Sequence, residues 1–165
     1  MTYEEFVNSR LPALLRYALM LSGDPDTAAD ITQETMIRVQ LKWRQVDRAE
    51  VPERYVRKIL TNVYLDWRRT SWLRRVSLRA APHEPPPVPD HADHAVERDR
   101  VWTLLSGLPR RQRAALVLRY YEGLADQEIA DVLGCAVGTV RAHISRALAT
   151  LRSVVTPANT GGGSR

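Results

Sequence analysis

The chain of 165 residues lacks several features that would direct it to other classes of protein. It has one cysteine, Cys135, which excludes an internal disulfide and a thiolate zinc site. No apolar run approaches the roughly 20 residues of a membrane span, and the N-terminus has no secretory signal pattern. No segment alternates apolar and polar residues as a strand does. We therefore expect an all-α protein of the reducing cytoplasm, made of two small helical domains.

The residue combinations of common enzymes are also missing. We find no nucleophile–base pair, no phosphate-cradling loop and no paired acids in an apolar setting. His83, His91 and His94, with Asp90 and Asp93, suggest a metal-dependent nucleic-acid-processing enzyme as one alternative. A proline-rich tract provides no fixed hydrogen-bond partners to orient metal ligands, so we interpret it as a solvated linker. We predict no enzyme, no catalytic residue, no cofactor and no metal site.

The net charge of +5 is unevenly distributed. Residues 1–50 carry 6 basic and 8 acidic groups, and residues 51–80 carry 8 and 2. Residues 81–100 carry 2 and 5, and residues 101–165 carry 8 and 4. Two basic blocks separated by an acidic one indicate two contacts with a polyanion, because neutralisation of phosphates drives nucleic-acid binding.

Five of the ten prolines fall within eight positions, between Pro82 and Pro89. This density excludes a helix and favours an extended linker. We therefore predict four segments. They are an N-terminal helical domain (1–76), a flexible linker (77–94), a C-terminal helical domain (95–155) and a disordered tail (156–165).

Three helices are expected in the N-terminal domain. Thr2 and Glu5 form a capping box, and Pro12 should kink or restart the helix that follows. Its predicted apolar face is Phe6, Leu11, Leu14, Leu15, Ala18 and Leu19. Asp24 and Pro25 should start a second helix, whose predicted inner face is Ala28, Ile31, Thr35, Val39 and Trp43. A third helix should start at Pro52 and bury Val56, Ile59, Leu60, Val63 and Trp67.

The C-terminal domain has the pattern of a helix-turn-helix between Leu124 and Leu151. A helix near residues 95–105 and another from Leu108-Pro109 to Tyr121 should precede it. Two short apolar stripes at helical spacing flank Gly134, which favours the left-handed conformation that ends a helix. The outer face of the second helix is basic and free of acids, with Thr139, Arg141, His143 and Arg146. This pattern favours the major groove of DNA as its ligand over a helical hairpin without one.

The segment DTAADITQETMIRVQLKW resembles region 2 of the sigma-70 family, which docks on the β′ clamp helices of RNA polymerase. The resemblance places Asp30, Gln33, Glu34 and Arg38 on that docking face, although the same spacing also fits an ordinary solvated helix face. The third helix carries arginines among aromatic side chains, a combination that binds phosphates and stacks on unpaired bases.

The same resemblance implies that the third helix reads the −10 promoter element. The residues implied are Arg57, Lys58, Asn62, Arg68 and Arg69. Asp66 is a candidate to orient Arg69, and the loop from Asp47 to Val51 corresponds to the family's loop that captures a flipped base.

The C-terminal block resembles region 4 of the same family, which touches the β-subunit flap and reads the −35 element. Here the implied DNA-reading residues are Thr139, Arg141, His143 and Arg146. The family commonly has serine where this chain has Ala136, and loss of that cap costs roughly 1 kcal/mol. We therefore expect weaker DNA binding or a shifted helix start.

The order of these motifs resembles a sigma factor of the extracytoplasmic-function (ECF) group, possibly an actinobacterial subgroup. The resemblance implies binding to core RNA polymerase and promoter DNA, with a possible anti-sigma partner. A stand-alone helix-turn-helix transcriptional regulator is the alternative, but it has no use for the docking face. We also expect the free protein to be compact, with linker acids holding the two basic faces.

Overall fold

The computed structural model describes the backbone of residues 1–78 and 100–155, and the side chains of residues 1–67 and 100–155. Within these ranges every regular element is a helix, as predicted. The N-terminal part contains α1 (Tyr3–Ser22), α2 (Pro25–Leu41), α3 (Trp43–Arg48) and α4 (Pro52–Leu78). The C-terminal part has helical residues 100–106, then α6 (Arg110–Tyr120), α7 (Asp126–Leu133) and α8 (Val137–Val155).

The start of α1 agrees with the prediction from the sequence, but the middle of the helix does not. Thr2 accepts a hydrogen bond from the Glu5 backbone N–H, and the Glu5 side chain accepts one from the Thr2 N–H. Pro12 lies inside a single helix, so the restart expected there does not occur. Removal of one backbone hydrogen bond by proline costs about 3 kcal/mol, which the burial of Phe6 before it and Leu14 after it helps to offset.

The predicted inner face of α1 is wrong at one residue, and the second predicted helix is divided into two. Leu15 is exposed, and Tyr17 and Leu21 are completely buried in its place, because the buried stripe of α1 turns toward α2 and α4. The second helix ends at Leu41, and Trp43 begins the separate short helix α3. Trp43 still packs inward, with its ring 5.9 Å from that of Tyr3 and 5.5 Å from that of Phe6.

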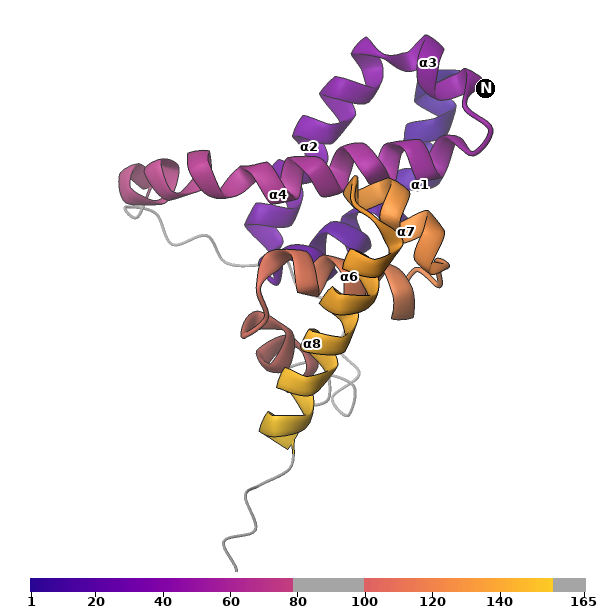
Figure 1. Ribbon diagram of the computed structural model, residues 1–165. Coiled ribbons are helices and arrows are strands. Elements are labelled where there is room, and N and C mark those ends of the chain that lie inside the picture. Colours follow the sequence, from indigo (N-terminus) through magenta and orange to yellow (C-terminus); the bar gives the residue numbers. More distant parts are fainter. Residues whose placement is uncertain (79–99, 156–165) are drawn as a thin grey trace, which may run out of the picture.

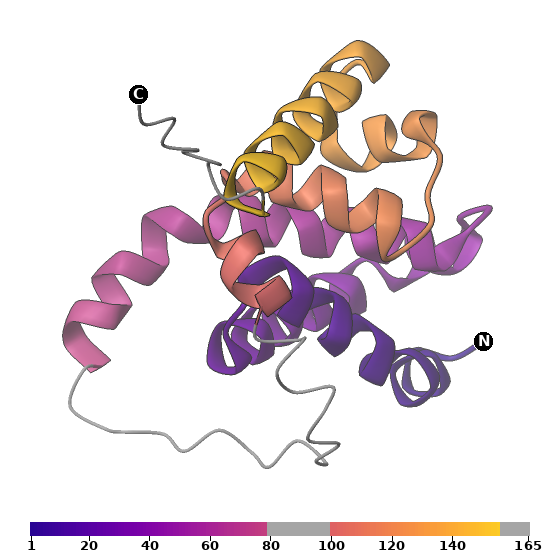
Figure 2. The same cartoon turned by 90° about the horizontal axis from the view of Figure 1, so that it is seen from below.

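The long helix α4 starts at Pro52 as predicted and lies at the centre of the arrangement. The helices α1 and α2 contact it from one side, and α6 and α7 contact it from the other (Figures 1 and 2). Val56, Leu60, Val63 and Trp67 of α4 are buried, while Ile59 is partly buried.

The predicted helix-turn-helix is present in α7 and α8. Gly134 ends α7 with φ +65°, the left-handed conformation that the sequence indicated. Ile129, Val132 and Leu133 of α7 are buried, as are Val140, Ile144 and Ala147 of α8. The packing of α7 and α8 on each other and on α6 completes this part of the fold.

The two parts of the chain share one hydrophobic core. The buried side chains of α1, α2 and α4 form a single cluster with those of α6, α7 and α8. The expected compactness is therefore observed in the described residues. The proline-rich tract and the predicted tail lie outside the described residues, as do residues 95–99 of the helix expected near Ala95.

Candidate nucleic-acid interface

The outer face of α2 presents the four predicted docking residues together. Asp30, Gln33 and Arg38 are exposed and Glu34 is half-buried. A guanidinium nitrogen of Arg38 lies 2.7 Å from Oε1 of Glu34, one turn earlier on the helix. The sequence reasoning missed Ile37 and Leu41, which continue the same face and are 54% and 82% exposed. Their positions, seven and eleven residues after Asp30, gave a helical signal that they share its face.

The side of α4 that was predicted to bind the −10 element is partly covered by the C-terminal part of the chain. A guanidinium nitrogen of Arg57 lies 2.8 Å from Oε2 of Glu122, and Nζ of Lys58 lies 3.7 Å from Oδ1 of Asp131. Asn62 is exposed. The side chains of Arg68 and Arg69 lie outside the described residues, although the α4 backbone that carries them is described.

A buried hydrogen-bond chain fixes α4 against α1. The Thr61 hydroxyl donates to the Arg57 carbonyl at 2.7 Å, so the Tyr17 hydroxyl, 2.7 Å away, is the donor to Thr61. Burial raises the pKa of Tyr17 well above its ordinary value, so the phenol stays protonated. This chain sets the rotation of α4, and with it the face on which Arg57 and Lys58 lie.

A cavity of about 420 Å³ lies where the chain enters α4. The predicted base-capture loop contributes to it from one side, and α4 and α7 contribute from the others. Its lining includes Glu50, Val51, Arg54, Tyr55, Lys58, Asn62 and Asp131. Asp47 of the predicted loop belongs instead to the last turn of α3, so only Ala49, Glu50 and Val51 connect the two helices.

The recognition face of α8 is largely exposed. Thr139, Arg141 and Arg146 are exposed, and α8 has no acidic residue. Nε of Arg141 lies 3.2 Å from Oδ2 of Asp126, whose other oxygen accepts from Arg119. The hydrogen bond from Arg119, aided by Arg141, lowers the pKa of Asp126. Asp126 therefore orients Arg141 without burying it.

His143 differs from the other predicted DNA-reading residues of α8. Its side chain is half-buried, and its Nδ1 is buried without a hydrogen-bond partner. Burial, together with the charges of Arg111 and Arg146, lowers the pKa of His143. The imidazole is therefore neutral at pH 7, so its contribution to DNA binding is not that of a cation.

The sequence reasoning also missed a set of contacts between the two parts of the chain. Nη2 of Arg54 lies 3.0 Å from Oε1 of Glu128, beside the Arg57–Glu122 and Lys58–Asp131 pairs. All four acids of residues 101–165 fall between Glu122 and Asp131. This concentration was visible in the sequence, but nothing in the sequence indicated that it faces α4.

Two arginines of α6 also contact the N-terminal part, so here the basic side chains come from the C-terminal part. Arg113 is buried and donates from Nε to the Met20 carbonyl, at 2.9 Å, in the last turn of α1. Arg110 donates to the Tyr64 carbonyl at 3.0 Å and stacks over the Tyr64 ring. The positive charge of Arg113 beside Met20 also interacts favourably with the negative end of the α1 dipole. The last turn of α1 has no basic residue of its own, so Arg113 supplies this charge.

No cluster of three or more metal-ligating side chains occurs among the described residues. The His83, His91 and His94 tract lies outside them. Among the helices that the structure describes, none is long and apolar enough to cross a membrane.

Comparison with known proteins gives a consistent result along the chain. Residues 6–74 match the model of "Sigma-70 region 2", and residues 98–151 match that of "Sigma-70, region 4". The chain is 34% identical to the RNA polymerase sigma-E factor of Streptomyces coelicolor over 150 residues, which are 91% of this chain and 84% of that protein. It is 32% identical to the ECF RNA polymerase sigma factor SigL of Mycobacterium tuberculosis, covering 84% of this chain and 80% of SigL.

Solved structures share the same fold. The sigma factor RpoE of Bartonella quintana, solved in complex with the anti-sigma factor NepR, has a TM-score of 0.73 and 23% identity. That match covers 92% of this chain and 95% of RpoE. CnrH, solved with the cytosolic domain of CnrY, has a TM-score of 0.61 and 22% identity, covering 92% of this chain and 86% of CnrH.

Proposed function

The chain belongs to the sigma-70 family, in its ECF group, and from this membership we propose which surface performs each step of its work. As a sigma factor it binds core RNA polymerase and promoter DNA and directs promoter-specific transcription initiation. The stand-alone regulator is not favoured, because a region 2 match covers residues 6–74.

The outer face of α2 is the surface that docks on core polymerase, at the β′ clamp helices. The observation that carries this assignment is the exposure of Ile37 and Leu41 beside Asp30, Gln33, Glu34 and Arg38. Apolar side chains that extend a polar helix face into solvent are typical of a protein-binding surface. A regulator acting on DNA alone would have no use for this face.

Promoter DNA is divided between α4 and α8. The basic side of α4, with Arg57, Lys58, Asn62, Arg68 and Arg69, binds the separated strand of the −10 element. The cavity at Glu50 and Val51 is the proposed site of a captured base. The α8 face with Thr139, Arg141 and Arg146 binds the −35 duplex, and His143 contributes from its edge.

Region 2 spans residues 1–76, a linker spans 77–94, region 4 spans 95–155 and residues 156–165 form a tail. Region 4 also contacts the β flap. The protein has no enzymatic activity of its own and acts in the cytoplasm, where its polymerase is. Because the RpoE neighbour was solved with an anti-sigma factor, a partner of that kind is also proposed here.

The docking assignment is tested by charge reversal and by removal of the apolar contact. Glu34→Lys and Leu41→Ser should each lower the affinity for core polymerase by about tenfold, or 1.4 kcal/mol, with unchanged melting temperatures because both sites reach solvent. Glu4→Lys on α1 makes the same charge change at an exposed position and is the control. Affinities equal to that of Glu4→Lys, in a titration of labelled protein with core polymerase, would refute the assignment.

A further inference from the structure

One carboxylate joins the ends of three helices beside the recognition face of α8. Asp126 is the first residue of α7, Arg119 lies in the last turn of α6 and Arg141 lies near the start of α8. Oδ2 of Asp126 accepts a hydrogen bond from Nε of Arg141 at 3.2 Å, and Oδ1 accepts one from Arg119. The side chain of Asp126 is 19% exposed and that of Arg141 is 69% exposed. The carboxylate is therefore held between helices, while the guanidinium that it contacts reaches solvent.

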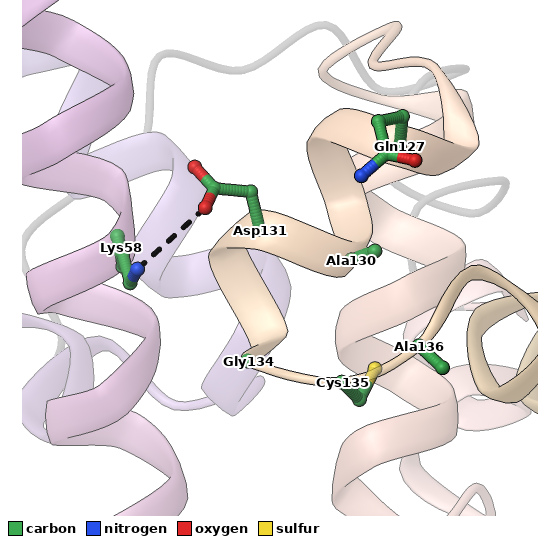
Figure 3. A pocket seen from close by; sticks show the side chains of 7 residues that line it. All are labelled: Lys58, Gln127, Ala130, Asp131, Gly134, Cys135 and Ala136. Atoms are coloured by element: carbon green, nitrogen blue, oxygen red, sulfur yellow. Dashed lines mark ion pairs between the residues drawn. The ribbon is translucent and has the colours of Figure 1, made fainter.

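The three acids of α7 face in different directions. Glu128 pairs with Arg54 and Asp131 pairs with Lys58, and both of these partners are on α4. Figure 3 shows Asp131 extending from one side of α7 toward Lys58. Five residues of a helix turn it by about 140° beyond a full turn, so Asp126 lies on another side of α7 than Asp131. From there it contacts α6 and α8.

The hydrogen bond to Asp126 uses only one edge of the Arg141 guanidinium. A guanidinium presents N–H donors along more than one edge of a rigid plane, and here Asp126 accepts from Nε. Among the described residues, Arg141 makes no other hydrogen bond or ion pair, so both of its Nη groups remain available. These two groups form the fork that donates to O6 and N7 of guanine in the major groove. Asp126 thus fixes the plane of the guanidinium and leaves the edge that recognises guanine open.

The same contact weakens the attraction between Arg141 and phosphates. Contacts to phosphates fix a protein on DNA but carry no sequence information. One negative charge lies here between two positive ones, and His143 on the same face is neutral at pH 7. Of the candidate DNA-reading residues of α8, all within the described part of the chain, Arg146 is the one cation without an ion pair. This low effective charge favours contacts to bases over contacts to the backbone.

We propose that Asp126 is a positioning residue for promoter recognition: it holds Arg141 in the orientation that selects guanine at one position of the −35 element, and away from the phosphates. The proposal rests on the proposed assignment of α8 to the −35 duplex. Ordering a long side chain before binding removes an entropic cost of the contact, which corresponds to about threefold to tenfold in affinity. Asp126 touches no base itself and acts through Arg141.

Base preferences along the −35 element test this role. Holoenzyme made from core polymerase and the full chain transcribes a barcoded library of promoters with a randomised −35 element. Arg141→Ala should abolish a guanine preference at one position, which a bidentate contact makes about fivefold to 150-fold. Asp126→Ala should lower the preference at that same position by about threefold to tenfold and leave the other positions unchanged. Glu4→Ala removes one acid from an exposed position of α1 and is the control.

The pattern of losses separates positioning from damage to the fold. The Asp126 carboxylate also stabilises the N-terminus of α7, so its removal weakens that helix. Equal losses at all −35 positions would assign Asp126 this structural role alone and overturn the proposal. If Arg141→Ala removes a guanine preference that Asp126→Ala keeps, the proposal is wrong and the assignment of α8 stands. If Arg141→Ala leaves every preference unchanged, the assignment of α8 is wrong and the proposal falls with it.

The double variant Asp126→Ala/Arg141→Ala tests whether Asp126 acts through Arg141. Its base preferences should equal those of Arg141→Ala, because Asp126 then has no side chain to position. A further loss at any −35 position in the double variant would show that Asp126 acts on DNA by another route, and the proposal would be wrong.

Salt dependence gives a second readout with the opposite sign to simple damage. Without the carboxylate, Arg119 and Arg141 both become available to phosphates. The logarithm of the binding constant of Asp126→Ala holoenzyme for promoter DNA should therefore fall more steeply with the logarithm of salt concentration, by about 0.9 for each phosphate gained. A slope equal to that of Glu4→Ala would show that Asp126 does not keep Arg141 from the backbone.

Discussion

Arg113 is the residue that most closely ties the two regions together. Its guanidinium is buried, donates to the Met20 carbonyl and lies against Gly23. A Cβ at Gly23 would stand 3.1 Å from an Arg113 nitrogen, and φ at Gly23 is +71°. Glycine at this position serves the turn and also leaves room for an arginine 90 residues later.

Gly23→Ala should therefore destabilise the free protein more than Gly134→Ala. Both glycines end helices with positive φ, so both variants carry the left-handed strain of about 1–2 kcal/mol. Only Gly23→Ala also displaces Arg113 from its charge-assisted hydrogen bond, which adds about 1.5 kcal/mol, because nothing lies within 4 Å of a Cβ at Gly134. Urea denaturation of the two variants measures the difference, and equal losses would show that Arg113 shifts freely.

His143 gives the recognition helix a pH dependence. Burial and nearby arginines lower its pKa in the folded state. As pH falls below about 6.5, the ordinary histidine pKa, the unfolded chain takes up a proton that the folded chain accepts only at lower pH, so stability falls. When the pH is lowered from 7.5 to 5.5, the melting temperature of the wild type should fall more than that of His143→Gln. Parallel losses would show that His143 titrates normally in the fold.

At the scale of elements, the helix-turn-helix lacks the side-chain cap that would fix the start of α8. The helix begins at Val137, directly after Ala136, whose carbonyl accepts from the Thr139 and Val140 N–H groups. Ala136 is exposed and its methyl group accepts no hydrogen bond. The start of α8 is therefore defined by the backbone alone.

Ala136→Ser should stabilise α8, because a serine oxygen at this position accepts a hydrogen bond from a free backbone N–H in the first turn of the helix. The expected gain in the free energy of unfolding is about 1 kcal/mol, measured by urea denaturation. The wild type is the reference, since alanine supplies no side-chain acceptor. If the serine variant is no more stable than the wild type, the cap does not form.

Helix boundaries and caps could be predicted from the sequence because their causes are local. Thr2, Asp24, Pro52 and Gly134 each act within one turn of their own position, and each marks the boundary expected. The helix was not interrupted at Pro12, because tertiary burial on both sides overrides a local preference. Contacts such as Arg113–Met20 and Arg54–Glu128 join distant positions, and a single sequence contains no signal of such a pairing.

At the scale of the whole molecule, the sequence indicates which helix faces are candidate surfaces better than it indicates whether the other part of the chain covers them. The candidate docking face of α2 and the candidate recognition face of α8 follow from helical periodicity, and all of their residues are exposed except the half-buried Glu34 and His143. That α4 would be covered depended on how two regions pack. The expected closure is present, but the acids that face α4 come from residues 122–131, and the linker acids lie outside the described residues.

Salt should loosen the free protein through these pairs. The Debye length falls from about 8 Å at physiological ionic strength to about 3 Å at 1 M. The Arg54–Glu128 and Lys58–Asp131 pairs are partly exposed to solvent, so added salt weakens them. The radius of gyration from solution scattering should rise with salt in wild type. The Glu128→Gln/Asp131→Asn variant should have a larger radius of gyration than wild type at low salt, and its radius should change less as salt is added. If both proteins show the same dependence on salt, other charges cause the effect.

The continuous core has a thermal consequence. Because apolar side chains of both regions belong to one cluster, their separation transfers apolar surface to water and carries a positive heat-capacity change. The free-energy difference between the closed and open forms is then curved in temperature, with a maximum at moderate temperature. Cooling weakens the apolar contribution to closure, so the balance between the closed and open forms shifts toward the open form in the cold as well as in the heat.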